Sequence, residues 1–123
     1  MGMYVAVRGW LEFDHGQREQ VERTLAEHRD DQYAGGWAFP ARPFNSTLYV
    51  FYGGDIREQA VASFREQVAE LARLNPVDDD LDRPVGFFLL SDERQGSTSW
   101  TIRDGEVADT VAPADLRWFA ERP

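Results

Sequence analysis

The chain has 123 residues, of which 42% are hydrophobic and 13% aromatic, so we expect a single domain, residues 1–123, whose core needs no metal or disulfide. It contains no cysteine, which excludes disulfides, thiolate catalysis and cysteine-based metal sites. Its 22 acidic and 13 basic residues give a formal net charge of −9, which argues against binding to nucleic acid or to an anionic membrane.

The first part of the chain alternates polar and apolar residues and then changes to helical spacing. Residues 3–13 alternate with period two, which predicts a long strand with one face in the core. Asp14 and Gln17 have the spacing of a capping box and predict a helix that ends near residue 31. A short strand is expected at 37–39.

The central part of the chain predicts a strand and the most regular helix. Residues 47–52 are aromatic or β-branched and predict a strand. Asp55 and Glu58 repeat the capping-box spacing after Gly53-Gly54, so we expect the glycines to form a turn and the helix to start at Asp55. Apolar residues then recur at helical spacing until Asn75-Pro76, which ends the helix.

The C-terminal third begins with an acidic loop at residues 78–82. Three strands are predicted after it, at residues 85–90, 97–103 and 106–111. Asp104-Gly105 joins the last two, because both residues accept the positive φ of a type I′ hairpin turn. Pro113 suits the first turn of a short terminal helix.

This order of elements predicts an α+β fold with an antiparallel sheet. The first six elements match the ferredoxin-like βαββαβ arrangement, in which both helices cover one face of the sheet. We therefore expect a ferredoxin-like core, followed by a C-terminal β-hairpin and a short helix. An α+β sheet with another strand order is compatible with the same elements.

Few side chains suit nucleophilic or acid–base chemistry, and we predict no catalytic residue. The chain has two histidines, His15 and His28. Asp14 could polarise His15 as a base, but we expect it to cap the helix instead. His28 continues an apolar stripe and is expected to be a packed or helix-end histidine.

The acidic loop contains Asp78, Asp79, Asp80 and Asp82. An EF-hand calcium loop needs glycine at its sixth position and glutamate at its twelfth, where this chain has Arg83 and Leu89. We therefore predict neither a metal site nor a cofactor. The loop is either a solvated segment or an electronegative surface for a cationic partner, because the acid excess would attract and steer a basic protein.

The outward face of the first strand is a second candidate binding surface. Tyr4, Arg8 and Trp10 should lie in a row there, and Tyr49 and Phe51 would join them from the neighbouring strand. Aromatic residues and arginine are enriched in interface hot spots. The alternative is that the hairpin or the terminal helix folds back and buries this face.

Four segments are rich in glycine and aromatic residues: Gly9-Trp10, Gly35-Gly36-Trp37, Phe51-Tyr52-Gly53-Gly54-Asp55 and Trp100-Thr101-Ile102. Together with the size, acidity and domain class of the chain, they resemble the pattern of small single-domain immunity proteins from bacterial polymorphic and contact-dependent toxin systems. The resemblance implies a cytoplasmic inhibitor without catalytic residues, which binds a cognate toxin domain, often a nuclease, and blocks its basic cleft.

We therefore expect a non-catalytic acidic module that binds a basic protein partner. Its predicted partner-binding residues are Tyr4, Arg8, Trp10, Tyr49, Asp78, Asp79, Asp80 and Asp82. The alternative is a small-molecule-binding protein or cofactor-independent enzyme of the dimeric ferredoxin-like type, in which the sheet face lines a pocket and two chains pair as a homodimer. The N-terminus lacks the features of a signal peptide, so we expect a cytoplasmic protein.

Overall fold

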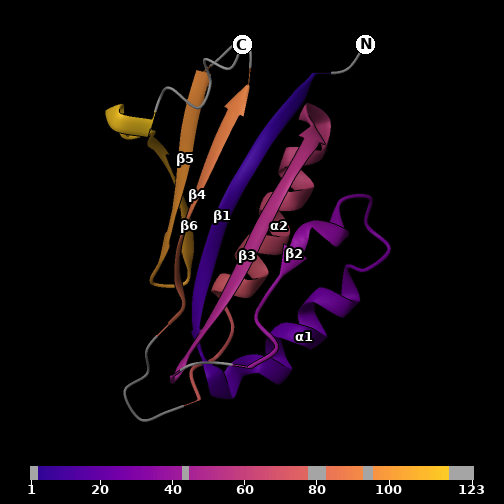
Figure 1. Ribbon diagram of the computed structural model, residues 1–123, viewed down its shortest axis with the longest axis vertical. Helices are drawn as coiled ribbons and strands as arrows, with labels where there is room; N and C mark the ends of the chain where they lie inside the picture. The colour runs from indigo at the N-terminus through magenta and orange to yellow at the C-terminus, as the bar shows by residue number, and fades with distance from the viewer. Residues whose placement is uncertain (1–2, 43–44, 78–82, 93–95, 117–123) are drawn as a thin grey trace.

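The computed structural model describes residues 3–42, 45–77, 83–92 and 96–116, which form an α+β fold with one six-stranded antiparallel sheet and two α-helices (Figure 1). The strands are β1 (Tyr4–Asp14), β2 (Trp37–Ala38), β3 (Thr47–Arg57), β4 (Val85–Asp92), β5 (Gly96–Arg103) and β6 (Glu106–Val111). The helices are α1 (Arg18–Glu27) and α2 (Val61–Ala72), with short 3-10 helices η1 (His15–Gln17), η2 (Ala34–Gly36) and η3 (Glu58–Ala60). No helix in the described ranges has the length and apolar composition needed to cross a bilayer.

The strand order of the sheet is β2-β3-β1-β4-β5-β6, and every neighbouring pair is antiparallel. β1 lies inside the sheet, where it pairs with β3 along its whole length and with β4 on its other side. Figure 1 shows α2 passing behind β1 and β3, with α1 beside it. We call the side of the sheet turned away from the helices the outer face.

Phe64 of α2 lies at the centre of an aromatic core. Its ring centroid is 4.4 Å from that of Tyr52 and 5.6 Å from that of Trp37. Phe88 of β4 and Trp100 of β5 lie 5.9 and 6.0 Å from it. Because these four rings come from β2, β3, β4 and β5, a single helical side chain connects α2 to all four strands.

The capping box predicted at the start of the first helix is confirmed. The carboxylate of Asp14 accepts a hydrogen bond from the backbone N–H of Gly16, and the side chain of Gln17 accepts one from the N–H of Asp14. Gln17 is buried, and its Nε2 donates to the carbonyl of Asn75 at 2.9 Å. The cap thus also fixes the end of β1 to the segment that follows α2.

The second predicted capping box is wrong. β3 continues through Gly53-Gly54 and Asp55 to Arg57, and Gly54 pairs with Val7 of β1. The strand continues here, in place of the predicted helix, because β1 pairs with β3 along its full length. The extension also buries Ile56 completely. The helical segment starts only after the strand, at η3, and has no side-chain cap.

The predicted hairpin turn is confirmed, because Asp104 and Gly105 adopt φ angles of 54° and 79° between β5 and β6. The predicted terminal helix falls mostly outside the described residues. Its described part is a single 3-10 turn at 114–116, in which the N–H of Leu116 donates to the carbonyl of Pro113 at 2.9 Å.

Gly9 provides a test of the close packing at the centre of the sheet. A Cβ at this position would collide with the carbonyl oxygen of Phe87 and lie 2.6 Å from the ring of Phe88. We expect Gly9→Ala to lower the free energy of unfolding by about 1–3 kcal/mol, because an overpacked core must distort. Urea denaturation measures this loss.

Gly53→Ala is the matched control in the same sheet, because a Cβ at Gly53 would have no heavy atom within 4 Å. We expect it to change the free energy of unfolding by less than about 1 kcal/mol. Equal losses in the two variants would contradict the packing described at Gly9.

Candidate functional site

The outer face carries the binding residues that were predicted on the strands. Tyr4, Arg8 and Trp10 alternate along β1 on this face, and Tyr49 of β3 lies opposite Glu12. Tyr4 and Tyr49 are 50% and 42% exposed, whereas Arg8 and Trp10 are partly buried. The four residues therefore share one face, as the alternation predicts, and their role in binding stays a prediction.

Four aromatic rings from three strands adjoin on this face. They are Trp10 of β1, Tyr49 and Phe51 of β3, and Phe87 of β4, which we call the outer aromatic cluster. The register places Trp10 between Phe51 and Phe87. The centroids of Trp10 and Phe87 are 6.0 Å apart, and the rings of Tyr49 and Phe51 stack at 6.2 Å with an interplanar angle of 12°. The cluster thus forms a strip across the sheet, made of two pairs of rings in contact that the register places side by side.

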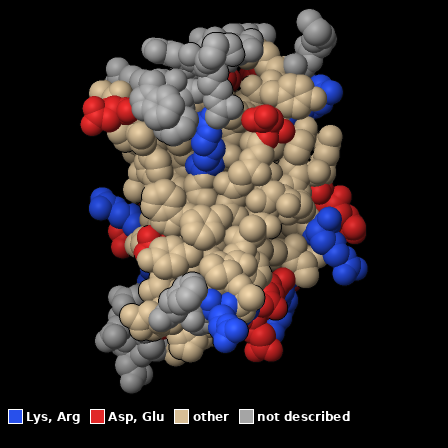
Figure 2. Space-filling view, viewed as in Figure 1, with Lys and Arg blue, Asp and Glu red and all other residues tan. Residues whose placement is uncertain are grey.

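The β3 part of this strip is exposed to solvent, whereas Trp10 and Phe87 are partly buried. Tyr49, Phe51, Tyr4 and Val85 are all more than 40% exposed on this one face. Figure 2 shows the face as a broad area whose centre lacks charged side chains, with most of the charges toward its margins. A large exposed apolar patch with a polar rim is typical of a protein–protein interaction site.

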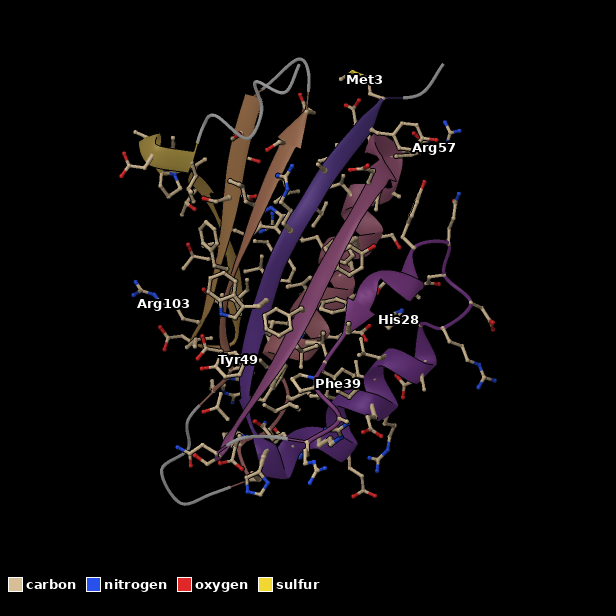
Figure 3. The ribbon with its side chains drawn as sticks, in the orientation of Figure 1. Met3, His28, Phe39, Tyr49, Arg57 and Arg103 are labelled. Atoms are coloured by element: carbon tan, nitrogen blue, oxygen red, sulfur yellow. The ribbon has the colours of Figure 1, made fainter. Side chains whose placement is uncertain are left out.

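Glu12 holds a negative charge beside the outer aromatic cluster. Its Oε2 accepts a hydrogen bond of 2.8 Å from the indole Nε1 of Trp10. This bond orients the indole and keeps a carboxylate within the strip of rings, opposite Tyr49. Figure 3 shows Tyr49 over the lower part of the sheet on the same face.

Arg8 is held against the sheet on its β4 side. Its Nη1 donates to Oγ of Ser91 at 3.4 Å, and Ser91 Oγ lies 3.2 Å from Oγ of Ser97. Leu89, its partner in the register, is only 4% exposed although it belongs to the outer face. The β4 side of the face is therefore more closely covered than the β3 side, where the exposed rings lie.

A polar network around His28 joins α1 to α2. His28 is the C-cap of α1, and its Nδ1 lies 2.9 Å from Oδ2 of Asp31 while its Nε2 lies 2.8 Å from Oε2 of Glu70. The hydrogen bond with Glu70 raises the pKa of His28; burial opposes this rise, and the hydrogen bond with Asp31 adds a smaller contribution in the same direction as Glu70. Gln67 donates to Asp31 at 3.1 Å.

Both ring nitrogens of His28 are engaged by carboxylates, so the ring serves as a cationic link between elements rather than as a base for a substrate (Figure 3). This position agrees with the helix-end histidine predicted from the sequence. His15 is exposed at the start of η1.

Burial raises the pKa of Tyr52, whose hydroxyl donates to the carbonyl of Tyr33 at 2.7 Å. This phenol is therefore a neutral donor within the core.

The remaining predicted binding residues, Asp78, Asp79, Asp80 and Asp82, lie outside the described residues. Within the described part of the chain, no group of three or more histidine and acidic side chains is arranged to hold a metal ion. The role of the acidic loop in binding a partner accordingly stays a prediction from the sequence.

Three cavities have linings that include none of the four rings of the outer aromatic cluster. One of about 370 Å³ lies near Gln17 and Arg83, and one of about 460 Å³ beside Thr101 and Ala108. A larger one of about 730 Å³ lies between α2 and strands β4 to β6. These cavities are lined by other residues than Tyr4, Arg8, Trp10 and Tyr49, so they do not support a ligand pocket built from that set.

Comparisons of the chain with protein-family models, with curated proteins and with solved structures found no match. The resemblance to immunity proteins therefore stays a prediction.

Two residues of this face are absent from the binding residues predicted from the sequence. Phe87 lies in the apolar run 85–90, where both faces of the strand carry apolar side chains and no alternation identifies the outward one. The alternation of residues 3–13 does place Glu12 on the same face as Trp10, but an acidic residue on an outward face is ordinary and gives no local sign of its bond to the indole.

The His28 network predicts that stability depends on pH. Because the folded pKa of His28 is raised, its protonation stabilises the fold fully below the ordinary value of 6.5, and the contribution is lost as the pH rises through the folded pKa. We expect wild type to be more stable than His28→Gln by on the order of 0.5–1 kcal/mol at acidic pH, a difference that shrinks at alkaline pH.

Urea denaturation at about pH 5.5 and about pH 8.5 measures this difference. His15→Gln is the control, because His15 is exposed, and it should track the wild type at both values. A gap between wild type and His28→Gln that is the same at the two pH values would contradict the charged link.

Proposed function

We propose that this protein is a non-catalytic binding module that docks a basic protein partner on the outer face of its sheet. The observation that carries the proposal is the outer aromatic cluster, in which Tyr49 and Phe51 are 42% and 46% exposed and stack on each other. Burying such rings against a partner would remove a large apolar area from water. Ordered aromatic side chains also lose little conformational entropy when they are buried.

The charge of the chain supports a basic partner. A net charge of −9 attracts a cationic surface and speeds its encounter with the protein. At the cluster itself, Glu12 lies among the rings, and its carboxylate is oriented by Trp10. An arginine of the partner could stack on the rings and pair with this carboxylate, a combination that the planar guanidinium favours.

We also propose a ferredoxin-like core extended by the β5–β6 hairpin. In the order β2-β3-β1-β4, α1 connects two strands that flank β3, and α2 connects two strands that flank β1. Split βαβ units of this kind define the ferredoxin-like arrangement. Such a core supports the proposed function, because it covers one side of the sheet with helices and leaves the other for a partner.

The partner that we propose is a toxin domain with a basic active-site cleft. The sequence resemblance to immunity proteins is the basis for this choice, and the acid excess of the chain and the rings on the outer face are compatible with it. An inhibitor of this kind works by occupying the cleft and needs no catalytic group of its own. It would act in the cytoplasm of the cell that makes the toxin.

The outer aromatic cluster can be tested with the double variant Tyr49→Ala/Phe51→Ala. The probe is each basic protein encoded beside this gene, titrated by isothermal calorimetry. We expect the double substitution to raise Kd at least about tenfold, or about 1.4 kcal/mol, because it removes two stacked hot-spot rings. Both residues are exposed, so the fold should persist, which circular dichroism can check.

Val77→Ala is the matched control, because Val77 is an exposed apolar side chain outside the sheet and should leave Kd unchanged. In the wild-type complex, added salt should slow association far more than it changes dissociation. A complex that is unaffected by the double substitution, or the lack of any complex with these basic proteins, would count against the proposal.

A further inference from the structure

A groove of about 730 Å³ opens on the helical side of the sheet, opposite the outer face. The β5–β6 hairpin approaches the C-terminal end of α2, where a Cβ at Gly105 would lie 4.0 Å from the carbonyl oxygen of Ala72. The groove lies beside the first turns of the helix, at Val61, Ala62 and Arg65. Hairpin and helix therefore diverge toward the N-terminal end of α2, and the groove is the space between them.

The lining of the groove is mainly apolar. Its apolar residues come from α2 and from strands β1, β4, β5 and β6: Val5, Val61, Ala62, Leu90, Trp100 and Val111. Val111, at the end of β6, is 76% exposed, which is the largest exposed fraction among the large apolar side chains of the described residues. A ligand with an apolar body would cover this side chain and the floor of the groove.

Arg65 spans the gap between α2 and β6. Its Nη1 lies 2.6 Å from Oδ2 of Asp109, and its Nη2 donates to the carbonyl of Val107 at 2.7 Å. The guanidinium carbon also lies 5.5 Å from the ring centroid of Trp100. These contacts fix the side chain of Arg65 along one side of the groove. The carboxylate of Asp109 neutralises its positive charge.

The charges around the groove favour a cation. Because Arg65 and Asp109 neutralise each other, the pair offers a ligand no net charge. Glu58, which is exposed in the turn before α2, and Asp92, at the end of β4, add two carboxylates to the lining. The net charge of −9 on the whole chain further disfavours an anion.

We propose that this groove binds a small hydrophobic organic cation, such as an ammonium group on an aromatic or aliphatic body. The body would lie against Val61, Trp100 and Val111, and the ammonium would face Glu58. The volume lies within the range of about 300–1,000 Å³ that is typical of sites for small organic molecules. This site is independent of the proposed docking face, because it lies on the other side of the sheet.

Three probes with the same body separate the effect of charge from that of the apolar surface. They are phenylbutylamine, phenylbutanol and phenylbutyrate, which are cationic, neutral and anionic at neutral pH. Their binding is followed by NMR on the indole N–H of Trp100 and the methyl groups of Val111. We expect the amine to bind at least about tenfold more tightly than the carboxylate, with the alcohol between them.

Two substitutions on neighbouring residues of α2 provide a matched comparison. Ala62→Trp places a large side chain in the groove and should weaken binding of the amine at least about tenfold. Ser63→Trp is the control, because Ser63 is exposed on the same helix and does not line the groove. Glu58→Gln keeps the shape of the groove and should reduce the preference for the amine over the alcohol.

Equal affinity of the three probes, or equal losses in Ala62→Trp and Ser63→Trp, would overturn the proposal. The variant Tyr49→Ala/Phe51→Ala must bind the amine like wild type, because its substitutions lie on the outer face. A failure of protein docking at the outer face and a failure of cation binding in the groove are therefore distinguishable.

Discussion

The packing of Phe64 against rings from four strands determines which side of the sheet is interior. Tyr52 and Phe88 point toward Phe64, at centroid distances of 4.4 and 5.9 Å. Because successive side chains on a strand point to opposite faces, Phe51 and Phe87 must then point outward. A slip of one residue in either strand would exchange the buried and the exposed rings. The aromatic core and the exposed strip of rings are thus two results of one register.

The features that could be predicted from the sequence are those decided by neighbouring residues. The turn at Asp104-Gly105 depends on two residues that accept positive φ, and both adopt it. The cap formed by Asp14 and Gln17 closes within four residues. The alternation of β1 likewise places Trp10 outward without reference to any other strand. In each case the interaction that selects the conformation lies within the segment itself.

The features that could not be predicted depend on partners far away in the chain. Asp55 and Glu58 have the same spacing as the first cap, yet pairing with β1 keeps Asp55 in a strand. Phe87 is assigned to the outer face only by its place beside Trp10 in the register. The groove beside α2 arises from the angle between a helix and a hairpin, which no local pattern encodes. Gln17 takes part in both kinds of interaction. Its capping bond with Asp14 is local and could be predicted, whereas its bond to Asn75 joins distant segments and could not.

The shallow seating of α1 has a consequence for the internal motions of the protein. Val21 is the buried apolar residue of this helix and Leu25 is only partly buried, whereas α2 buries Phe64, Val68 and Leu71. Elements with few buried apolar contacts open at lower free energy than the core. The backbone amides of α1 would therefore exchange with solvent before those of α2. Such an opening would unfold a part of the helical layer while the central strands keep their pairing.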